Sequence, residues 1–231
     1  MASNLNLIVM LTHNDRTVGN AYEIFRECKD SKAEYWGFKE KSLPLDEMKD
    51  LYKLMKDCKK TTFLEVVEYT EEKGLEGARI AVECGCDILM GTVFFDSINE
   101  FCKKNNMKYM PFVGKVTERP SVLEGEINEI IDEAKNYIEK GVYGIDLLGY
   151  RYKGNAEELN RKLVAQIEAP VCIAGSIDSY KRLREVKEIS PWAFTIGGAF
   201  FENKFGKNFG EQINRVCEYI ENKDVTGEEN V

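Results

Sequence analysis

Hydrophobic residues along this chain follow two alternating patterns. Short apolar runs, rich in β-branched and aromatic residues, are each followed by a longer segment with apolar residues at i, i+3 and i+4. The short runs predict strands at residues 5–11, 33–39, 61–67, 86–90, 107–113, 142–148, 170–174 and 193–196. The longer segments predict a helix within 18–28 and helices at 45–58, 75–84, 97–104, 127–140, 157–167, 180–189 and 209–220.

This alternation predicts an α/β fold of one kind. Strands that alternate regularly with helices form a parallel sheet with right-handed crossovers. Eight such units in 231 residues leave no room for a second domain, so we expect residues 1–231 to form a single (β/α)8 TIM-barrel domain. We expect the acidic tail after about residue 222 to be frayed.

Composition narrows the class of protein further. A formal net charge of -8 argues against nucleic acid and anionic membrane surfaces as partners. No apolar run approaches the roughly 20 residues that span a bilayer, and no signal-peptide pattern is present at the N-terminus. Seven cysteines, an odd number without regular spacing, are typical of reduced thiols. We therefore expect a cytoplasmic protein. We also expect a homodimer, because this is the commonest assembly among soluble oligomers.

The sequence gives little reason to expect a metal or cofactor. Cys84 and Cys86 lack a second pair of ligands, and His13 is the only histidine, which argues against a structural zinc site. Glu65 and Asp146 alone are a thin ligand set for a divalent cation. We predict neither a metal nor a cofactor.

Two strand ends near the C-terminus predict an anion site. The runs PVCIAGSID (170–178) and WAFTIGGA (192–199) each end in small residues, and a helical pattern follows both. Such ends let a ligand approach the backbone closely and offer it free N–H groups. In eight-stranded barrels the usual phosphate site lies in the loops after the seventh and eighth strands. The sequence therefore predicts a small phosphorylated molecule as the substrate.

Four charged residues lie in or just after predicted strands: Lys39, Glu65, Lys115 and Asp146. A charge inside a barrel strand is expected to point inward, and near the C-terminal end of the strand it faces the substrate. Burial and mutual proximity shift pKa values, as acid–base chemistry requires. We therefore take these four residues as candidate catalytic groups.

Each candidate also has a plainer interpretation. Glu65 could be a buried structural carboxylate paired with Lys39, and Lys115 could be solvated at the start of a loop. Asp146 is the strongest candidate, because its neighbours Ile145 and Leu147 imply that an outward-facing carboxylate would meet apolar surface.

Polar residues in two loops belong to the same predicted rim. His13 follows the first strand and is a candidate because histidine as a residue type changes charge near neutral pH, although Asp15 could instead cap the next helix and leave His13 exposed. After the sixth strand, Tyr150 and Arg151 would project over the mouth, and Arg151 or Lys153 could hold an anionic substrate.

The C-terminal third resembles the ribulose-phosphate-binding barrels, and within them the N-acetylmannosamine-6-phosphate 2-epimerases. The resemblance rests on GIDLLGY (144–150), PVCIAGSI (170–177) and IGGAFF (196–201), three motifs within a stretch of about 60 residues. It implies that backbone groups of Gly175, Ser176, Gly197 and Gly198 hold a phosphate. The run MPFVGKVT (110–117) is also similar to the fifth strand of phosphogluconate aldolases.

The resemblance does not extend to the catalytic groups of those enzymes. The epimerase's strand-seven glutamate corresponds to Ala174, and its lysine near the end of strand three corresponds to Val66 or Val67. The Schiff-base lysine of the aldolases lies on strand six, where this chain has Asp146. The phosphate site is what carries over.

Three functions fit these residues. The first is an isomerase or epimerase of a phosphorylated sugar, in which Asp146 or Glu65 removes a proton α to a carbonyl while Lys39 or Lys115 stabilises the enediolate. The second is a lyase: an aldolase with Lys39 or Lys115 as its Schiff-base lysine, or a metal-free decarboxylase. The third is a barrel that binds a sugar phosphate without converting it. Four charged groups at one mouth favour catalysis, and we expect an isomerase or epimerase.

Overall fold

The structure is a computed structural model and describes residues 5–221. Its centre is an eight-stranded parallel sheet in the order β10-β11-β12-β1-β4-β5-β6-β7. The strands are β1 (Asn6–Met10), β4 (Tyr35–Lys39), β5 (Thr61–Val66), β6 (Ile88–Gly91), β7 (Lys108–Met110), β10 (Ile145–Leu147), β11 (Val171–Ile173) and β12 (Ala193–Ile196). The predicted TIM barrel is confirmed; the predicted frayed tail lies outside the described residues.

The barrel closes between its two outermost strands, β7 and β10. The N–H of Tyr143 donates to the carbonyl of Tyr109 at 2.9 Å, and the N–H of Asp146 donates to that of Pro111 at 3.0 Å. A single bridge, between Phe112 and Asp146, pairs the two segments. We call this junction the seam.

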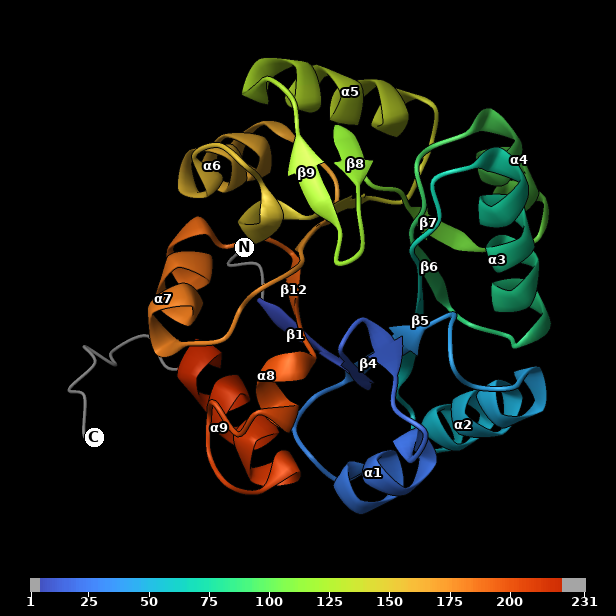
Figure 1. The fold of residues 1–231 in the computed structure, drawn as a ribbon, viewed down its shortest axis with the longest axis vertical. Helices are drawn as coiled ribbons and strands as arrows, with labels where there is room; N and C mark the ends of the chain where they lie inside the picture. Colours follow the sequence, from blue (N-terminus) through green and yellow to red (C-terminus); the bar gives the residue numbers. More distant parts are fainter. Residues whose placement is uncertain (1–4, 222–231) are drawn as a thin grey trace.

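The helices form an outer ring around the strands (Figure 1). They are α1 (Ala21–Cys28), α2 (Leu45–Asp57), α3 (Glu71–Glu83), α4 (Asp96–Lys104), α5 (Ile127–Glu139), α6 (Ala156–Gln166), α7 (Tyr180–Ile189) and α9 (Phe209–Glu221), and the short α8 (Gly198–Phe201) lies between β12 and α9, inside this ring. The ends of α6 and α7 follow from local chemistry. Asn155 and Ser179 accept hydrogen bonds from the N–H groups of Glu158 and Arg182, and α7 stops at Ser190, whose φ is 55°.

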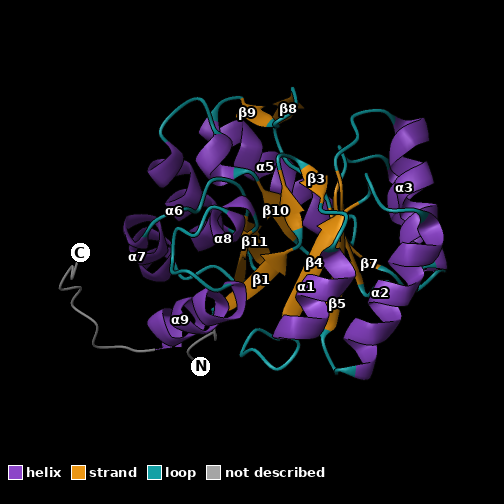
Figure 2. Cartoon of the chain, turned by 60° about the horizontal axis from the view of Figure 1, so that its bottom comes forward, coloured by secondary structure: helices purple, strands orange, loops and turns teal. Residues whose placement is uncertain are grey.

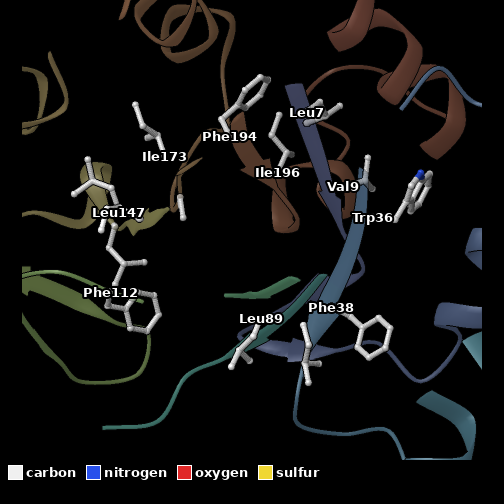
Figure 3. Close-up of a cluster of buried hydrophobic side chains, with 14 of the residues drawn as sticks. Leu7, Val9, Trp36, Phe38, Leu89, Phe112, Leu147, Ile173, Phe194 and Ile196 are labelled. Carbon is white, nitrogen blue, oxygen red and sulfur yellow. The ribbon is translucent and has the colours of Figure 1, made fainter. Parts of the chain in front are cut away.

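The hydrophobic core has two parts, one outside and one inside the barrel. Outward-facing residues of the strands, together with Phe112 just after β7, pack against the helices, and Figure 3 labels several of them. Inside, a smaller cluster consists of Ile8, Met10, Phe63, Ile88, Met90, Met110, Cys172 and Ala193. At the N-terminal end of the barrel, Trp192 packs against the rings of Tyr35, Phe63 and Tyr143, with centroid separations of 5.8, 6.4 and 6.1 Å. This end of the barrel is therefore filled by an aromatic plug.

Several short elements were not predicted. Two antiparallel hairpins interrupt the βα pattern: β2 (Thr12–His13) with β3 (Arg16–Thr17), and β8 (Lys115–Thr117) with β9 (Val122–Glu124). The one-turn helices η1 (Gly149–Arg151) and α8 were also missed. Both hairpins follow strands of the barrel, and Figure 2 shows β8 and β9 standing at one end of the molecule. The additions therefore cluster where the loops lead from strand to helix.

Within residues 5–221, none of the helices combines the length and apolarity that a bilayer span needs.

Candidate active site

A cavity of about 310 Å³ lies at the C-terminal ends of the strands. It is lined by residues at the C-terminal ends of β1, β4, β5 and β12, by residues that follow β1, β10, β11 and β12, and by the β8–β9 turn. They are Met10, Thr12, His13, Asn14, Asp15, Lys39, Glu65, Pro120, Ser121, Leu148, Arg151, Ala174, Gly175, Ser176, Ile177, Asp178, Thr195, Ile196, Gly197, Gly198, Ala199 and Glu202. The position matches the usual location of active sites in this fold.

Lys39 forms the centre of a charged cluster in the cavity. Its Nζ donates to Oδ1 of Asp15 and lies 3.6 Å from Oε1 of Glu65. Lys39 and Glu65 are paired across adjacent strands, which brings both side chains into the barrel interior. The backbone of Lys39 is fixed as well, because Thr17 Oγ1 donates to its carbonyl at 2.7 Å and accepts from its N–H at 3.0 Å. The three side chains are between 11% and 14% exposed, so the cluster is nearly shielded from water.

The cluster shifts the pKa values of its members in a definite direction. Burial alone would lower the pKa of Lys39, but the charge of Glu65 and the bond to Asp15 outweigh it and raise that pKa above its ordinary value. Burial raises the pKa of Glu65, and the charge of Lys39 only partly offsets this. Lys39 is therefore held as an ammonium ion, while Glu65 is moved toward the pKa range that a general base at neutral pH requires.

Asp146 lies beneath the cluster rather than on the cavity surface. It points into the barrel, as predicted, but it is fully buried and is not among the residues that line the cavity. Within residues 5–221, neither carboxyl oxygen of Asp146 has a hydrogen-bond partner. Burial, followed by the charge of Glu65, raises the pKa of Asp146 well above its ordinary value. A substrate in the cavity would meet Glu65 before Asp146.

Lys115 lies on β8, outside the cavity. Its side chain is 71% exposed and its Nζ is 3.3 Å from Oε2 of Glu124 on the paired strand. Lys115 does not reach the predicted position at the mouth, because the chain turns into the β8–β9 hairpin directly after β7 instead of entering the next helix. The plainer interpretation, a solvated lysine, describes what the structure shows.

The loops after β11 and β12 form the opposite wall, where the anion site was predicted. Gly175 and Ser176 both have positive φ, 83° and 52°, which turns the chain sharply at the end of β11. Gly197 packs against the loop after β1, where an added Cβ would lie 2.8 Å from the carbonyl oxygen of Thr12. The helix α8 begins at Gly198, and the first N–H groups of a helix have no intrahelical acceptor. All four predicted residues line one wall of the cavity.

Arg151 supplies a cation to this wall. Its side chain lies over Gly175, where an added Cβ would be 2.8 Å from Cγ of Arg151. Lys39 and Arg119 are engaged by carboxylates, whereas no carboxylate of the described chain lies within ion-pair distance of Arg151. A half-buried guanidinium without an ion partner can bind an incoming anion without breaking a native bond.

The other rim predictions have different outcomes. His13 lines the cavity, stacks on Phe201 with centroids 5.4 Å apart, and has Nε2 3.8 Å from Oε1 of Glu202. Tyr150 is buried beside Arg182, whose guanidinium lies 4.1 Å from the ring centre, and it does not line the cavity. Lys153 is paired with Glu124 outside the cavity.

Asp15 is a site residue that the sequence analysis missed. It was considered only as a helix cap, but α1 begins at Ala21 and its cap position is Asn20. Asn14 and Asp15 instead form the two-residue turn of the β2–β3 hairpin, with φ values of 49° and 62°. Asn and Asp tolerate such turns well, so an Asn-Asp pair between Thr-His and Arg-Thr was the available signal.

Sequence comparisons identify no relatives: no family model and no curated protein matches this chain. Solved structures, however, share its fold. Orotidine 5′-phosphate decarboxylase from Pyrococcus horikoshii OT3 has a TM-score of 0.69 at 11% identity, covering 94% of this chain and 99% of that chain. N-(5′-phosphoribosyl)anthranilate isomerase from Pyrococcus furiosus has a TM-score of 0.66 at 12% identity, covering 94% and 98%.

N-acetylmannosamine-6-phosphate 2-epimerase from Clostridium perfringens has a TM-score of 0.63 at 13% identity, covering 84% of this chain and 86% of that chain. The resemblance noted in the sequence therefore agrees with the structural similarity at the level of the fold. Because one fold hosts many chemistries, these similarities leave the specific reaction to be argued from the site.

Proposed function

We propose that this protein is an isomerase or epimerase of a phosphorylated sugar that transfers a proton α to a carbonyl group. The observation that carries the proposal is that one cavity has two chemically different walls, a charged cluster and a candidate anion site. One wall holds a buried ammonium between two carboxylates, and the other holds the Gly175–Ser176 and Gly197–Gly198 turns with the free guanidinium of Arg151.

The phosphate would bind at the second wall, in contact with Arg151 and the backbone N–H groups of the two turns. Its sugar carbon chain would then extend toward Lys39 and Glu65. Glu65 would accept the proton from the carbon next to the carbonyl, and the ammonium of Lys39 would stabilise the negative charge that develops on the carbonyl oxygen. In an isomerase the same carboxyl group would return the proton to the neighbouring carbon, whereas inversion by an epimerase would take a proton from a second acid on the opposite face.

The state of Lys39 favours this reaction over a Schiff-base aldolase. Attack on a carbonyl requires a neutral amine, whereas the charge of Glu65 and the bond to Asp15 raise the pKa of Lys39 despite its burial. An ammonium ion suits the stabilisation of an enediolate. A lyase without a Schiff base is a second candidate, since the decarboxylase from Pyrococcus horikoshii OT3 has the same fold.

The first experiment is a thermal-shift screen with inorganic phosphate and a panel of pentose, hexose and amino-sugar phosphates. A ligand that binds the native state raises its stability by mass action, without any assumption about chemistry. We expect one sugar phosphate to stabilise the protein well beyond phosphate alone. If neither phosphate nor any sugar phosphate raises the melting temperature, the proposed anion site is wrong.

The second experiment tests catalysis with the stabilising compound in deuterium oxide. We expect deuterium at the carbon next to the carbonyl, detected by NMR, and loss of this uptake in Glu65→Gln. Glu83→Gln is the matched control, because Glu83 lies on α3 in an exposed ion pair with Lys49. Binding without deuterium uptake by the wild-type protein would favour a binding protein, and carbon–carbon cleavage or loss of carbon dioxide would favour a lyase.

A further inference from the structure

The β8–β9 hairpin lies across the mouth of the cavity and is held at both sides. On the β10 side, the N–H of Lys153 donates to the carbonyl of Leu123 at 3.0 Å, and Tyr152 Oη donates to that of Gly125 at 2.6 Å. On the β5 side, Tyr69 Oη donates to the carbonyl of Glu118 at 2.6 Å. Figure 1 shows the hairpin turn reaching toward the centre of the ring of strands.

Arg119 in the hairpin turn makes the ionic contacts to the opposite rim. Its Nη1 lies 3.5 Å from Oδ2 of Asp15, and its Nη2 lies 3.0 Å from Oε1 of Glu40 and 3.5 Å from Oε1 of Glu68. It also donates to the carbonyl of Val67. These partners come from the loops after β1, β4 and β5, so one side chain ties the hairpin to three loops of the rim.

Asp15 is shared between Arg119 and the catalytic cluster. Its Oδ1 accepts from Lys39, whereas its Oδ2 faces Arg119. Asp15 sits at a two-residue turn, and its carboxylate is held from two sides, by Lys39 on one oxygen and Arg119 on the other. Arg119 fills the second position, and the neighbouring residues Pro120 and Ser121 line the cavity.

We propose that Arg119 is a positioning residue, which holds the β8–β9 hairpin across the cavity and fixes the carboxylate of Asp15 on Lys39. The proposal rests on the proposed function only for the role of Lys39 in the reaction. The contacts themselves make predictions that need no substrate.

The surroundings of Lys39 provide a direct readout. The charged groups around its ammonium are Asp15, Glu65 and, at longer range, Asp146 and Arg151. If Asp15 turns away when Arg119 is removed, Lys39 loses one of its two anionic partners, and its amine becomes easier to deprotonate. If Asp15 stays in place, the removal of a nearby cation has the opposite effect on Lys39. The two outcomes differ in sign.

The experiment uses the unliganded protein and three variants: Arg119→Ala, Arg119→Lys and the control Lys115→Ala. Lys115 lies in the same hairpin and pairs with Glu124, away from the cavity. Hydrogen–deuterium exchange reports on residues 115–124, and acylation of Lys39 across a pH series, followed by mass spectrometry, reports its pKa.

We expect Arg119→Ala to accelerate exchange in the hairpin at least about tenfold and to increase the acylation of Lys39 at pH 8 several-fold. Arg119→Lys keeps one cation and is expected to restore part of both effects, and Lys115→Ala should resemble the wild-type protein. Unchanged or slower acylation of Lys39 in Arg119→Ala would overturn the proposal, even if the hairpin loosens. If Arg119→Ala does not fold, the same comparison is made with Arg119→Met, which keeps the length of the side chain without its charge, and unchanged or slower acylation there overturns the proposal.

These outcomes are separate from the test of the proposed function. A protein that binds no sugar phosphate can still show the coupling between Arg119 and Lys39. A protein that converts one can lack this coupling.

Discussion

The two ends of the barrel interior contain opposite kinds of side chain, aromatic at one end and charged at the other. At the N-terminal end, Trp192 and three other aromatic rings fill the barrel. At the C-terminal end, Lys39 lies between two carboxylates beside a cavity of about 310 Å³. The first end stabilises by removing apolar surface from water, whereas the second keeps charged groups in partial burial, which contributes little to stability by itself. The difference separates the part of the interior that maintains the fold from the part available for chemistry.

The largest effect on this comparison is expected from truncation in the aromatic plug. Phe63 is fully buried and contacts both Tyr35 and Trp192. Phe63→Ala is expected to lower the free energy of unfolding by about 3–5 kcal/mol, measured by urea denaturation, because it leaves a cavity. Phe63→Leu should lose clearly less. Folded Phe63→Ala protein should keep the melting-temperature increase caused by phosphate, and loss of that increase would show that the two ends are coupled.

A second prediction concerns the pH dependence of stability at Asp146. Burial and the charge of Glu65 raise the pKa of Asp146, so the folded state binds this proton more tightly than the unfolded state does. The wild-type protein therefore loses stability as the pH rises from the unfolded pKa, about 3.9, through the folded pKa. Asn does not titrate, so the stability of Asp146→Asn relative to the wild type should increase with pH, by at most about 1.4 kcal/mol per pH unit.

Urea denaturation between pH 4 and pH 8 measures this difference. Asp132→Asn is the matched control, because the Asp132 side chain on α5 is 78% exposed. A stability difference between Asp146→Asn and the wild type that does not change with pH would mean that Asp146 titrates normally in the folded protein.

The third prediction distinguishes the two walls of the cavity. Arg151→Ala is expected to weaken the binding of inorganic phosphate by about 1.5–3 kcal/mol, because one charge-assisted hydrogen bond is lost. This corresponds to a Kd roughly 10- to 150-fold higher by calorimetry. Arg161→Ala, on the outer face of α6, should leave the Kd unchanged. Equal affinities of the Arg151→Ala and wild-type proteins would place the anion elsewhere.

The smallest effect is expected at Lys115. Its ion pair with Glu124 is exposed, so Lys115→Ala should change the free energy of unfolding by no more than about 0.5 kcal/mol. Phosphate affinity and deuterium uptake should match the wild-type values. A large loss of deuterium uptake would show that the hairpin can carry Lys115 into the cavity.

The barrel could be predicted from the sequence because its signals are local and repeated. The predicted helix at 180–189 and strand at 193–196 coincide with α7 and β12, and the inward direction of Lys39, Glu65 and Asp146 followed from their place in strands. The depth of Asp146 could not be predicted. Its position below Glu65 depends on how strands from opposite sides of the barrel are staggered, which the order of residues does not state.

The hairpins escaped prediction for a different reason. Each β8 or β9 strand has three residues, too few for a period-two pattern to stand out from a loop. The roles of Asp15 and Arg119 depend on these hairpins, because the two residues are far apart in the sequence and meet only when both turns fold over the same mouth. Candidates in the strands and in the loops directly after β10, β11 and β12 were therefore found, while Asp15 and Arg119, which meet through the two hairpin turns, were missed.

The seam between β7 and β10 is the part of the barrel wall where local opening is expected first. A single bridge pairs these segments, whereas β4 and β5 pair over five residues. The residue that supplies this bridge from β10 is Asp146, whose carboxyl group is fully buried. Transient parting of the seam would admit water to that carboxyl group and let it ionise. Alkaline conditions should therefore favour the open seam, whereas protonation of Asp146 favours the closed one, so the strength of this junction in the barrel wall depends on pH.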